Sequence, residues 1–233
     1  MSAPRVKLDI DASREKLASL GCSYAAEALE ALLAEAVRNE MPAHVFLDRL
    51  LDTELAGREE RRIKAMLKVS KIPTGQTLEN FDFAFQPAIE RSRIETLATG
   101  SWIRSAEVLL LQGPPGVGKS HLLVALGIRA IELGFSAQYF RFDELMTALK
   151  ADAHLPASRI KARKYMSTAL LLIDEMGYLN LRPEQSNIFF KLMEERYRRR
   201  LCTLITTNLD YEEWYGFLGQ KAMVGALLDR LRH

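Results

Sequence analysis

The sequence of 233 residues has little of what marks membrane or secreted proteins. Its two cysteines, Cys22 and Cys202, lie far apart and without the spacing of metal ligands. They exclude a disulfide framework and indicate small, buried or half-buried thiols in a reducing compartment. The longest apolar runs, VLLL and ALLLI, are too short to cross a bilayer, and the first residues lack the apolar core of a signal peptide. We therefore expect a cytoplasmic protein with no membrane partner.

A strong charge of either sign is also missing. The formal net charge is +2, so a nucleic-acid contact would have to come from the distribution of charge. Residues 1–57 hold six basic and ten acidic residues, whereas residues 58–71 hold six basic and two acidic ones. Five of these bases recur every three or four positions and share one helix face: Arg58, Arg61, Lys64, Lys68 and Lys71. Such a face suits contact with DNA phosphates; the alternative is a solvated face on which Glu59 and Glu60 pair with nearby bases.

Residues 10–71 contain no convincing strand, so we expect residues 1–71 to form a small all-α N-terminal domain. Three helices are expected over about 11–20, 24–39 and 43–71, with Ser23 capping the second and Pro73 stopping the third. Gly57 is a candidate kink in the third helix. An apolar stripe in its first half should pack on the other helices: Leu47, Leu50, Leu51 and Leu55. Residues 72–88 are rich in turn formers and aromatics, and predict a linker.

Residues 89–233 alternate between helix and strand patterns. Four apolar runs are typical of buried strands: VLLLQG (108–113), AQYFRF (137–142), ALLLIDE (169–175) and LCTLITTN (201–208). Apolar strands separated by helices predict an α/β core, with a parallel sheet and flanking helices on both faces.

The first of these strands leads into a phosphate-loop pattern, Gly113-x4-Gly118-Lys119-Ser120, which opens a helix. Its glycines allow backbone N–H groups to surround phosphates, Lys119 supplies a point charge, and Ser120 offers a hydroxyl to Mg²⁺. The candidate nucleotide-binding residues are Gly113, Pro114, Pro115, Gly116, Val117, Gly118, Lys119, Ser120 and His121.

Polar side chains end the last two strands of the pattern. Asp174 and Glu175 follow a buried strand and would lie at the sheet edge that holds the phosphate loop. Asp174 is the candidate Mg²⁺ ligand, and Glu175 the candidate general base for an attacking water. Asn208 ends the following strand and could reach the γ-phosphate and that water. No NKxD-type segment is present to bind guanine, so we expect ATP or ADP with Mg²⁺.

These motifs in this order resemble AAA+ ATPases, in the branch that holds DnaC-type helicase loaders and IstB-type transposition helpers. The match to the IstB-like family covers nearly the whole chain. Its segments are GREERRIKAMLKVSKIP, TLENFDF, GPPGVGKSHLLVALG, LLLIDEMGYL, ERYRRR, TTNLDYEEW and LLDRLRH. The resemblance implies a bacterial ATPase that oligomerises on double-stranded DNA, helps to choose the target, and recruits or stimulates an IstA-type transposase.

The resemblance also implies roles for residues outside the nucleotide motifs. Arg230 matches the family's arginine finger, which acts in a neighbouring subunit, and Arg232 is its competitor. Helicase loaders of this branch carry a helical insertion where residues 143–166 lie, and its bases are candidate DNA contacts: Arg159, Lys161, Arg163 and Lys164. The family continues into a segment with a second sensing arginine, whereas this sequence stops at His233. We expect the ATPase domain, 89–233, to lack that segment.

Three functions remain open at this point: a transposition helper, a DnaC-like replicative helicase loader, and an ATP-gated scaffold with no DNA role. The basic face over 58–71 and the IstB-type motifs favour the first. A further basic run, Arg196, Arg198, Arg199 and Arg200, is expected to be a solvated helix end.

Overall fold

The computed structural model describes residues 9–177, 181–219 and 224–225, and the chain divides into two compact units, Met1–Ala65 and Met66–His233. The division falls within the helix α3 (Ala43–Ser70), which runs on to the residues just before Pro73. Cys22 is half-buried and Cys202 is buried, and both are free thiols, as the sequence predicts.

The N-terminal unit contains α1 (Ile10–Ser19), α2 (Ser23–Arg38) and the first part of α3. Asp9 caps α1, because its Oδ1 accepts the backbone N–H groups of Asp11 and Ala12 at 3.1 and 3.2 Å. The prediction that Ser23 caps α2 is wrong, since Ser23 is already helical. A carboxylate from α3 caps the first turn of α2 instead, because Glu54 Oε2 accepts the N–H of Ala25 at 2.9 Å.

The apolar stripe of α3 packs less than its sequence predicts. Leu50 is buried, but Leu47, Leu51 and Leu55 are 53, 52 and 64 % exposed. Gly57 lies within an unbroken helix. A Cβ at this position would lie 2.3 Å from Cγ of Tyr24, so the glycine lets that ring pack against the backbone of α3.

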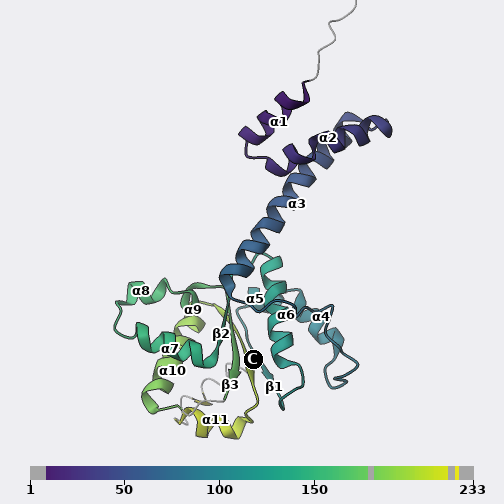
Figure 1. Cartoon of the computed structure of the whole chain (residues 1–233). Helices are drawn as coiled ribbons and strands as arrows, with labels where there is room; N and C mark the ends of the chain where they lie inside the picture. The colour runs from purple at the N-terminus through teal and green to yellow at the C-terminus, as the bar shows by residue number, and fades with distance from the viewer. Residues whose placement is uncertain (1–8, 178–180, 220–223, 226–233) are drawn as a thin grey trace, which may run out of the picture. The chain divides into compact units, whose positions relative to one another are not determined.

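The larger unit is built on four parallel strands in the order β1-β4-β3-β2, which confirms the predicted parallel sheet (Figure 1). The strands are β1 (Val108–Gln112), β2 (Ala137–Arg141), β3 (Leu170–Met176) and β4 (Cys202–Thr207). The helices are α4 (Arg91–Ala98), α5 (Ser101–Arg104), α6 (Lys119–Glu132), α7 (Phe142–Asp152), α8 (Ala157–Lys161), α9 (Lys164–Ser167), α10 (Pro183–Arg198) and α11 (Tyr211–Leu218).

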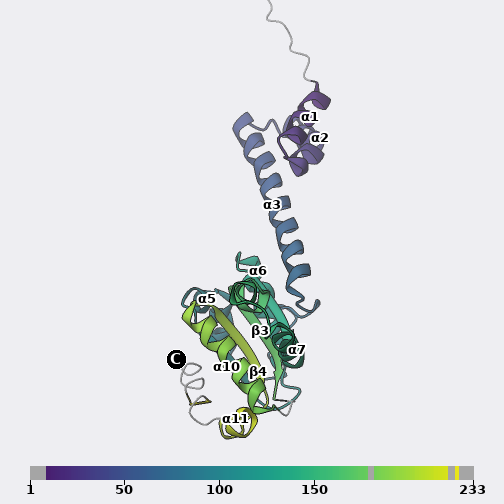
Figure 2. The same ribbon diagram turned by 90° about the vertical axis from the view of Figure 1, so that its left-hand side faces the viewer.

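Helices cover both faces of this sheet, with α6 on one face and α7 and α10 on the other (Figures 1 and 2). Leu171 and Ile173 pack with Phe142 and Phe189 in the core on the α7 side. On the opposite face, a Cβ at Gly127 of α6 would lie 2.4 Å from Cδ1 of Leu172, so α6 packs very close to β3. Successive residues of β3 are therefore buried on alternate faces, which is why its sequence is continuously apolar. Within the described ranges, no helix is both long and apolar enough to cross a membrane.

Candidate functional site

The phosphate-loop residues form the turn between β1 and α6. Gly116 and Gly118 have φ of 83° and 87°, a region that favours glycine. Gly118 also faces a ring, because a Cβ there would lie 2.8 Å from Cε2 of Phe81. Lys119 begins α6, and its Nζ donates to the carbonyl oxygens of Gly113 and Pro114, each at 2.7 Å. Partial burial lowers the pKa of Lys119, and the nearby Asp174 opposes this shift.

Asp174 is 4 % exposed, and donors occupy both of its carboxylate oxygens. Ser120 Oγ donates to Oδ1 at 2.8 Å, the N–H of Glu175 donates to it at 3.1 Å, and the hydroxyl of Thr206 also donates to it. The hydroxyl of Tyr139 donates to Oδ2 at 3.0 Å. The two predicted Mg²⁺ ligands, Ser120 and Asp174, are therefore hydrogen-bonded to each other beside the phosphate loop.

Glu175 lies within β3 but has a left-handed conformation, with φ of 59°, at an irregularity in the β3–β4 register between Ile173 and Met176. Its N–H donates to Thr206 Oγ1 at 2.9 Å. Its carboxylate pairs with Arg141 at the end of β2, with 2.9 Å between Nη2 and Oε2. The left-handed backbone and the ion pair with Arg141 together set the position of the Glu175 carboxylate. Backbone strain of this kind is common at functional sites.

A pocket of about 340 Å³ joins the loop to the ends of β3 and β4. It is lined by Gln76, Pro115, Gly116, Gly118, Lys119, Ser120, His121, Glu175, Thr206, Thr207 and Asn208. The Oδ1 atom of Asn208 is buried, and no described residue donates a hydrogen bond to it. A buried acceptor without a donor is rare in native proteins, so this atom suits a donor brought by a bound molecule or water.

The predicted linker contributes residues that the sequence analysis missed. The carbonyl oxygen of Thr77 bonds His121 Nε2 at 2.8 Å, and Gln76 lines the pocket. Phe81 is 8 % exposed, and its ring meets the ring of His121 edge-on, with 5.1 Å between centroids. The apolar residues of TLENFDF, in a segment without helix or strand, were the signal that this segment packs against the loop.

The predicted DNA-contact residues lie on or next to helices and do not line this pocket. On α3, Arg58 pairs with Glu54 and also donates to the carbonyl oxygen of Gly21 at 3.0 Å, and Lys64 pairs with Glu60. Among the residues that the structure describes, no ion pair joins Arg61 or Lys68 to an acid. Lys71 follows α3 and is exposed.

The second predicted DNA contact lies around α8, where Arg159 and Lys161 are exposed and Arg163 pairs with Asp152 at 2.6 Å. The predicted arginine finger, Arg230, and its competitor, Arg232, lie outside the described residues.

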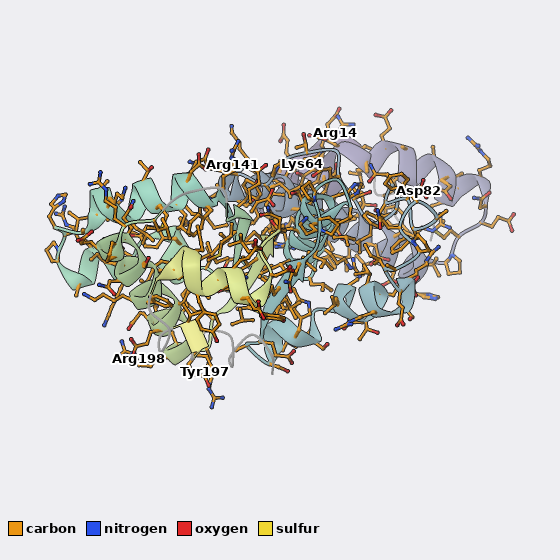
Figure 3. The ribbon with its side chains drawn as sticks, turned by 90° about the horizontal axis from the view of Figure 1, so that it is seen from below. Arg14, Lys64, Asp82, Arg141, Tyr197 and Arg198 are labelled. Carbon is orange, nitrogen blue, oxygen red and sulfur yellow. The ribbon has the colours of Figure 1, made fainter. Side chains whose placement is uncertain are left out.

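The prediction for Arg196 is wrong, because this side chain is 1 % exposed. It donates to the carbonyl oxygens of Tyr165, Thr168 and Cys202 and to the hydroxyl of Thr203. Its neighbours Tyr197 and Arg198 project from the surface of α10 and are not part of this buried cluster (Figure 3). Arg196 faces inward because α10 covers the sheet, and no basic run in a sequence shows which of its members faces the core.

The fold and the site together define a nucleotide-binding protein of the P-loop class with an AAA+ fold. Over residues 15–233 the chain matches the model of a family described as IstB-like ATP binding protein, and it belongs to this family. It is 35% identical over 206 residues to an insertion sequence IS21 ATP-binding protein of Pseudomonas aeruginosa, covering 88% of this chain and 77% of that one. An IS5376 relative from Geobacillus stearothermophilus is 34% identical over 208 residues, covering 89% and 82%. The DnaC helicase loader structure aligns with a TM-score of 0.52 at 21% identity, over 60% of this chain and 83% of that one, and supports the fold.

Proposed function

We propose that this protein is an ATPase of insertion-sequence transposition, which oligomerises on duplex DNA, selects or presents the target, and recruits or stimulates an IstA-type transposase. The observation that carries the ATPase part is the convergence of Lys119, Ser120, Asp174, Glu175 and Asn208 on one pocket edge. Membership of a family of insertion-sequence ATP-binding proteins supports the transposition part.

Each of these five residues has a role in hydrolysis. Lys119 exchanges its bonds to the loop carbonyls for the β- and γ-phosphate oxygens. Ser120 and Asp174 would hold Mg²⁺ together with those oxygens and water, and the ion would offset phosphate charge. Glu175, placed by its turned backbone and Arg141, accepts the proton of the attacking water, and Asn208 Oδ1 orients that water.

The remaining catalytic group would come from a second copy of the chain. We assign Arg230 this role from the family resemblance, and an arginine finger supplied in trans contributes about 10³–10⁵ in rate. Hydrolysis should therefore depend on assembly, and DNA is the proposed scaffold for that assembly. On α3, Arg61 and Lys68 are the strongest candidates for phosphate contacts, with Lys64, Lys71 and Arg58 beside them. Arg159, Lys161 and Arg163 form the second proposed contact.

The test compares two variants of equal charge in the full chain. Arg61→Glu with Lys68→Glu reverses the proposed contact, and Lys16→Glu with Arg38→Glu makes the same charge change at exposed positions on α1 and α2. With duplex DNA and a non-hydrolysable ATP analogue, the unchanged protein should grow into a large complex on a sizing column. The α3 variant should bind DNA more weakly, and its dependence of log affinity on log salt should be shallower by about 2. Equal effects of the two variants would exclude a specific α3 contact, and failure of the unchanged protein to bind duplex would overturn the proposed function.

A helicase loader is the second candidate, and the exposed leucines of α3 favour it. Leu47, Leu51 and Leu55 present an apolar stripe that a partner protein could cover. A loader would prefer single-stranded over double-stranded DNA and would bind a replicative helicase through this stripe. Competition between the two forms of DNA therefore separates the two functions.

A further inference from the structure

Strand β2 is the outer strand beside β3, and one of its side chains reaches across to the acid pair. The register aligns Tyr139 with Leu172 and Arg141 with Asp174. Facing residues of neighbouring strands lie on the same side of the sheet, so Tyr139 and Arg141 share the α6 side with Asp174. This is the side on which Ser120 and the phosphate loop lie.

The hydroxyl of Tyr139 completes the hydrogen bonding of Asp174. It donates to Oδ2 at 3.0 Å, whereas Ser120, Thr206 and the N–H of Glu175 donate to Oδ1. Three donors hold Oδ1, and the hydroxyl of Tyr139 holds the second oxygen of the same rigid, planar group, so the four donors together fix one orientation of the carboxylate. Burial, followed by the charge of Asp174, raises the pKa of Tyr139.

We propose that Tyr139 is a positioning residue for the Mg²⁺ site, which acts through Asp174 and does not touch the nucleotide. Partners that hydrogen-bond a metal-binding carboxylate orient it, and their loss typically weakens metal affinity or activity about 10–100-fold. This inference rests on the proposed use of Mg-ATP. It adds a residue that lies outside both nucleotide motifs and that only the strand register brings to the site.

The chain contains a matched control for this bond. Tyr165 donates to Asp152 Oδ2 at 2.9 Å, at a place away from the pocket. Burial raises the pKa of Tyr165 too, and its hydrogen bond to Asp152 adds to that shift. Tyr139→Phe and Tyr165→Phe each remove one hydroxyl bound to one aspartate. A general loss of stability should appear in both variants, and a change at the metal site in Tyr139→Phe alone.

The experiment measures binding of a fluorescent, non-hydrolysable ATP analogue to the full chain while Mg²⁺ is titrated, and separately in EDTA. In Tyr139→Phe the half-saturating Mg²⁺ concentration should rise about tenfold, the low end of the range, because Oδ1 keeps its three donors. Affinity in EDTA should not change. Electron paramagnetic resonance of bound Mn²⁺ should show the same loss of metal affinity. Tyr165→Phe should match the unchanged protein in all three measurements, although its thermal unfolding temperature falls.

Three results would overturn the inference. Tyr139→Phe with an unchanged Mg²⁺ requirement would show that Ser120, Thr206 and the backbone suffice. An equal rise in Tyr165→Phe would assign the effect to stability. If the unchanged protein bound the analogue without any response to Mg²⁺, the proposed use of Mg-ATP would fail together with the role of Tyr139, whereas the first two results leave the proposed function in place.

Discussion

The carboxyl ends of the strands form one edge of the sheet and the amino ends form the opposite edge. Each of these edges buries one charged side chain, and the two charges have opposite kinds of hydrogen-bond partner. At the carboxyl edge, Asp174 is an anion surrounded by donors: three hydroxyls and one N–H. At the amino edge, Arg196 is a cation surrounded by acceptors: three carbonyl oxygens and one hydroxyl. Both side chains are almost completely buried, at 4 and 1 % exposed.

The surroundings of each charge explain why one edge binds and the other holds the fold together. Hydroxyl donors can rotate and also accept, so Ser120 can turn its oxygen from Asp174 toward a metal. The guanidinium is rigid, with donors in fixed directions, and fixed carbonyls meet it. The carboxyl edge also keeps unused capacity, because no donor in the described part of the chain bonds Asn208 Oδ1. Burial is the main cause that lowers the pKa of Arg196 to about 9. This shift means that burial of the cation at the amino edge costs free energy.

The largest expected effect is the loss of ATP hydrolysis in Asp174→Asn, at the carboxyl edge. The amide keeps the shape of the carboxylate and removes its charge, so hydrolysis of Mg-ATP on DNA should fall by about 10²–10⁴-fold, the equivalent of several kcal/mol of metal-dependent stabilisation. The free energy of unfolding should change by about 1 kcal/mol or less, because rotating hydroxyls can adjust to the amide. Asp152→Asn is the control, and steady-state ATPase assays with urea unfolding check both. Equal losses of activity would contradict the special role of the carboxyl edge.

The next largest effect should come from Arg196→Met at the other edge. Methionine fills the space but removes the side-chain donor from the carbonyls of Tyr165, Thr168 and Cys202, and those of Tyr165 and Thr168 lie outside the strand ladder. Each buried acceptor without a partner costs about 1–3 kcal/mol, so we expect a loss of about 3–5 kcal/mol in the free energy of unfolding. ATP affinity of the folded fraction should be unchanged.

Arg199→Met is the matched control for this second prediction, because Arg199 donates to a single carbonyl, that of Met166, at 2.8 Å. It should lose about 1 kcal/mol. Urea unfolding followed by circular dichroism gives both values. A loss for Arg196→Met no larger than that of Arg199→Met would show that the carbonyl cluster contributes little to stability.

Sequence patterns predicted the carboxyl edge well because its residues follow from short, local rules. A parallel strand that ends in Asp174 and Glu175 must deliver them to the edge at which the phosphate loop lies, and the structure brings both to Lys119 and Ser120 as predicted. The amino edge follows no such rule. Arg196 was assigned to solvent because a run of bases at a helix end is usually solvated, and only the packing of α10 on β4 decides otherwise.

Tyr139 and the segment around Phe81 were missed for a related reason. Their contacts with Asp174 and with Gly118 join residues 35 or more positions apart, so they depend on strand register and chain path. For the leucines of α3, the sequence predicted more packing than the structure has. Their spacing correctly predicts one apolar face, but spacing alone does not say that α1 and α2 cover only Leu50 of it.

The smallest and most direct test of the comparison uses two threonines of the same strand. Thr203 Oγ1 accepts from Arg196 Nε at 3.1 Å at the amino edge, and Thr206 Oγ1 donates to Asp174 at the carboxyl edge. Valine has nearly the same shape as threonine, so Thr203→Val and Thr206→Val each remove one hydroxyl, and each should cost about 1 kcal/mol of unfolding free energy. Their functional effects should differ: the Mg²⁺ needed for half-maximal binding of an ATP analogue should rise several-fold in Thr206→Val and stay constant in Thr203→Val. Because both residues are buried in β4, an equal shift in the two variants would mean that strand stability, and not the position of Asp174, controls metal binding.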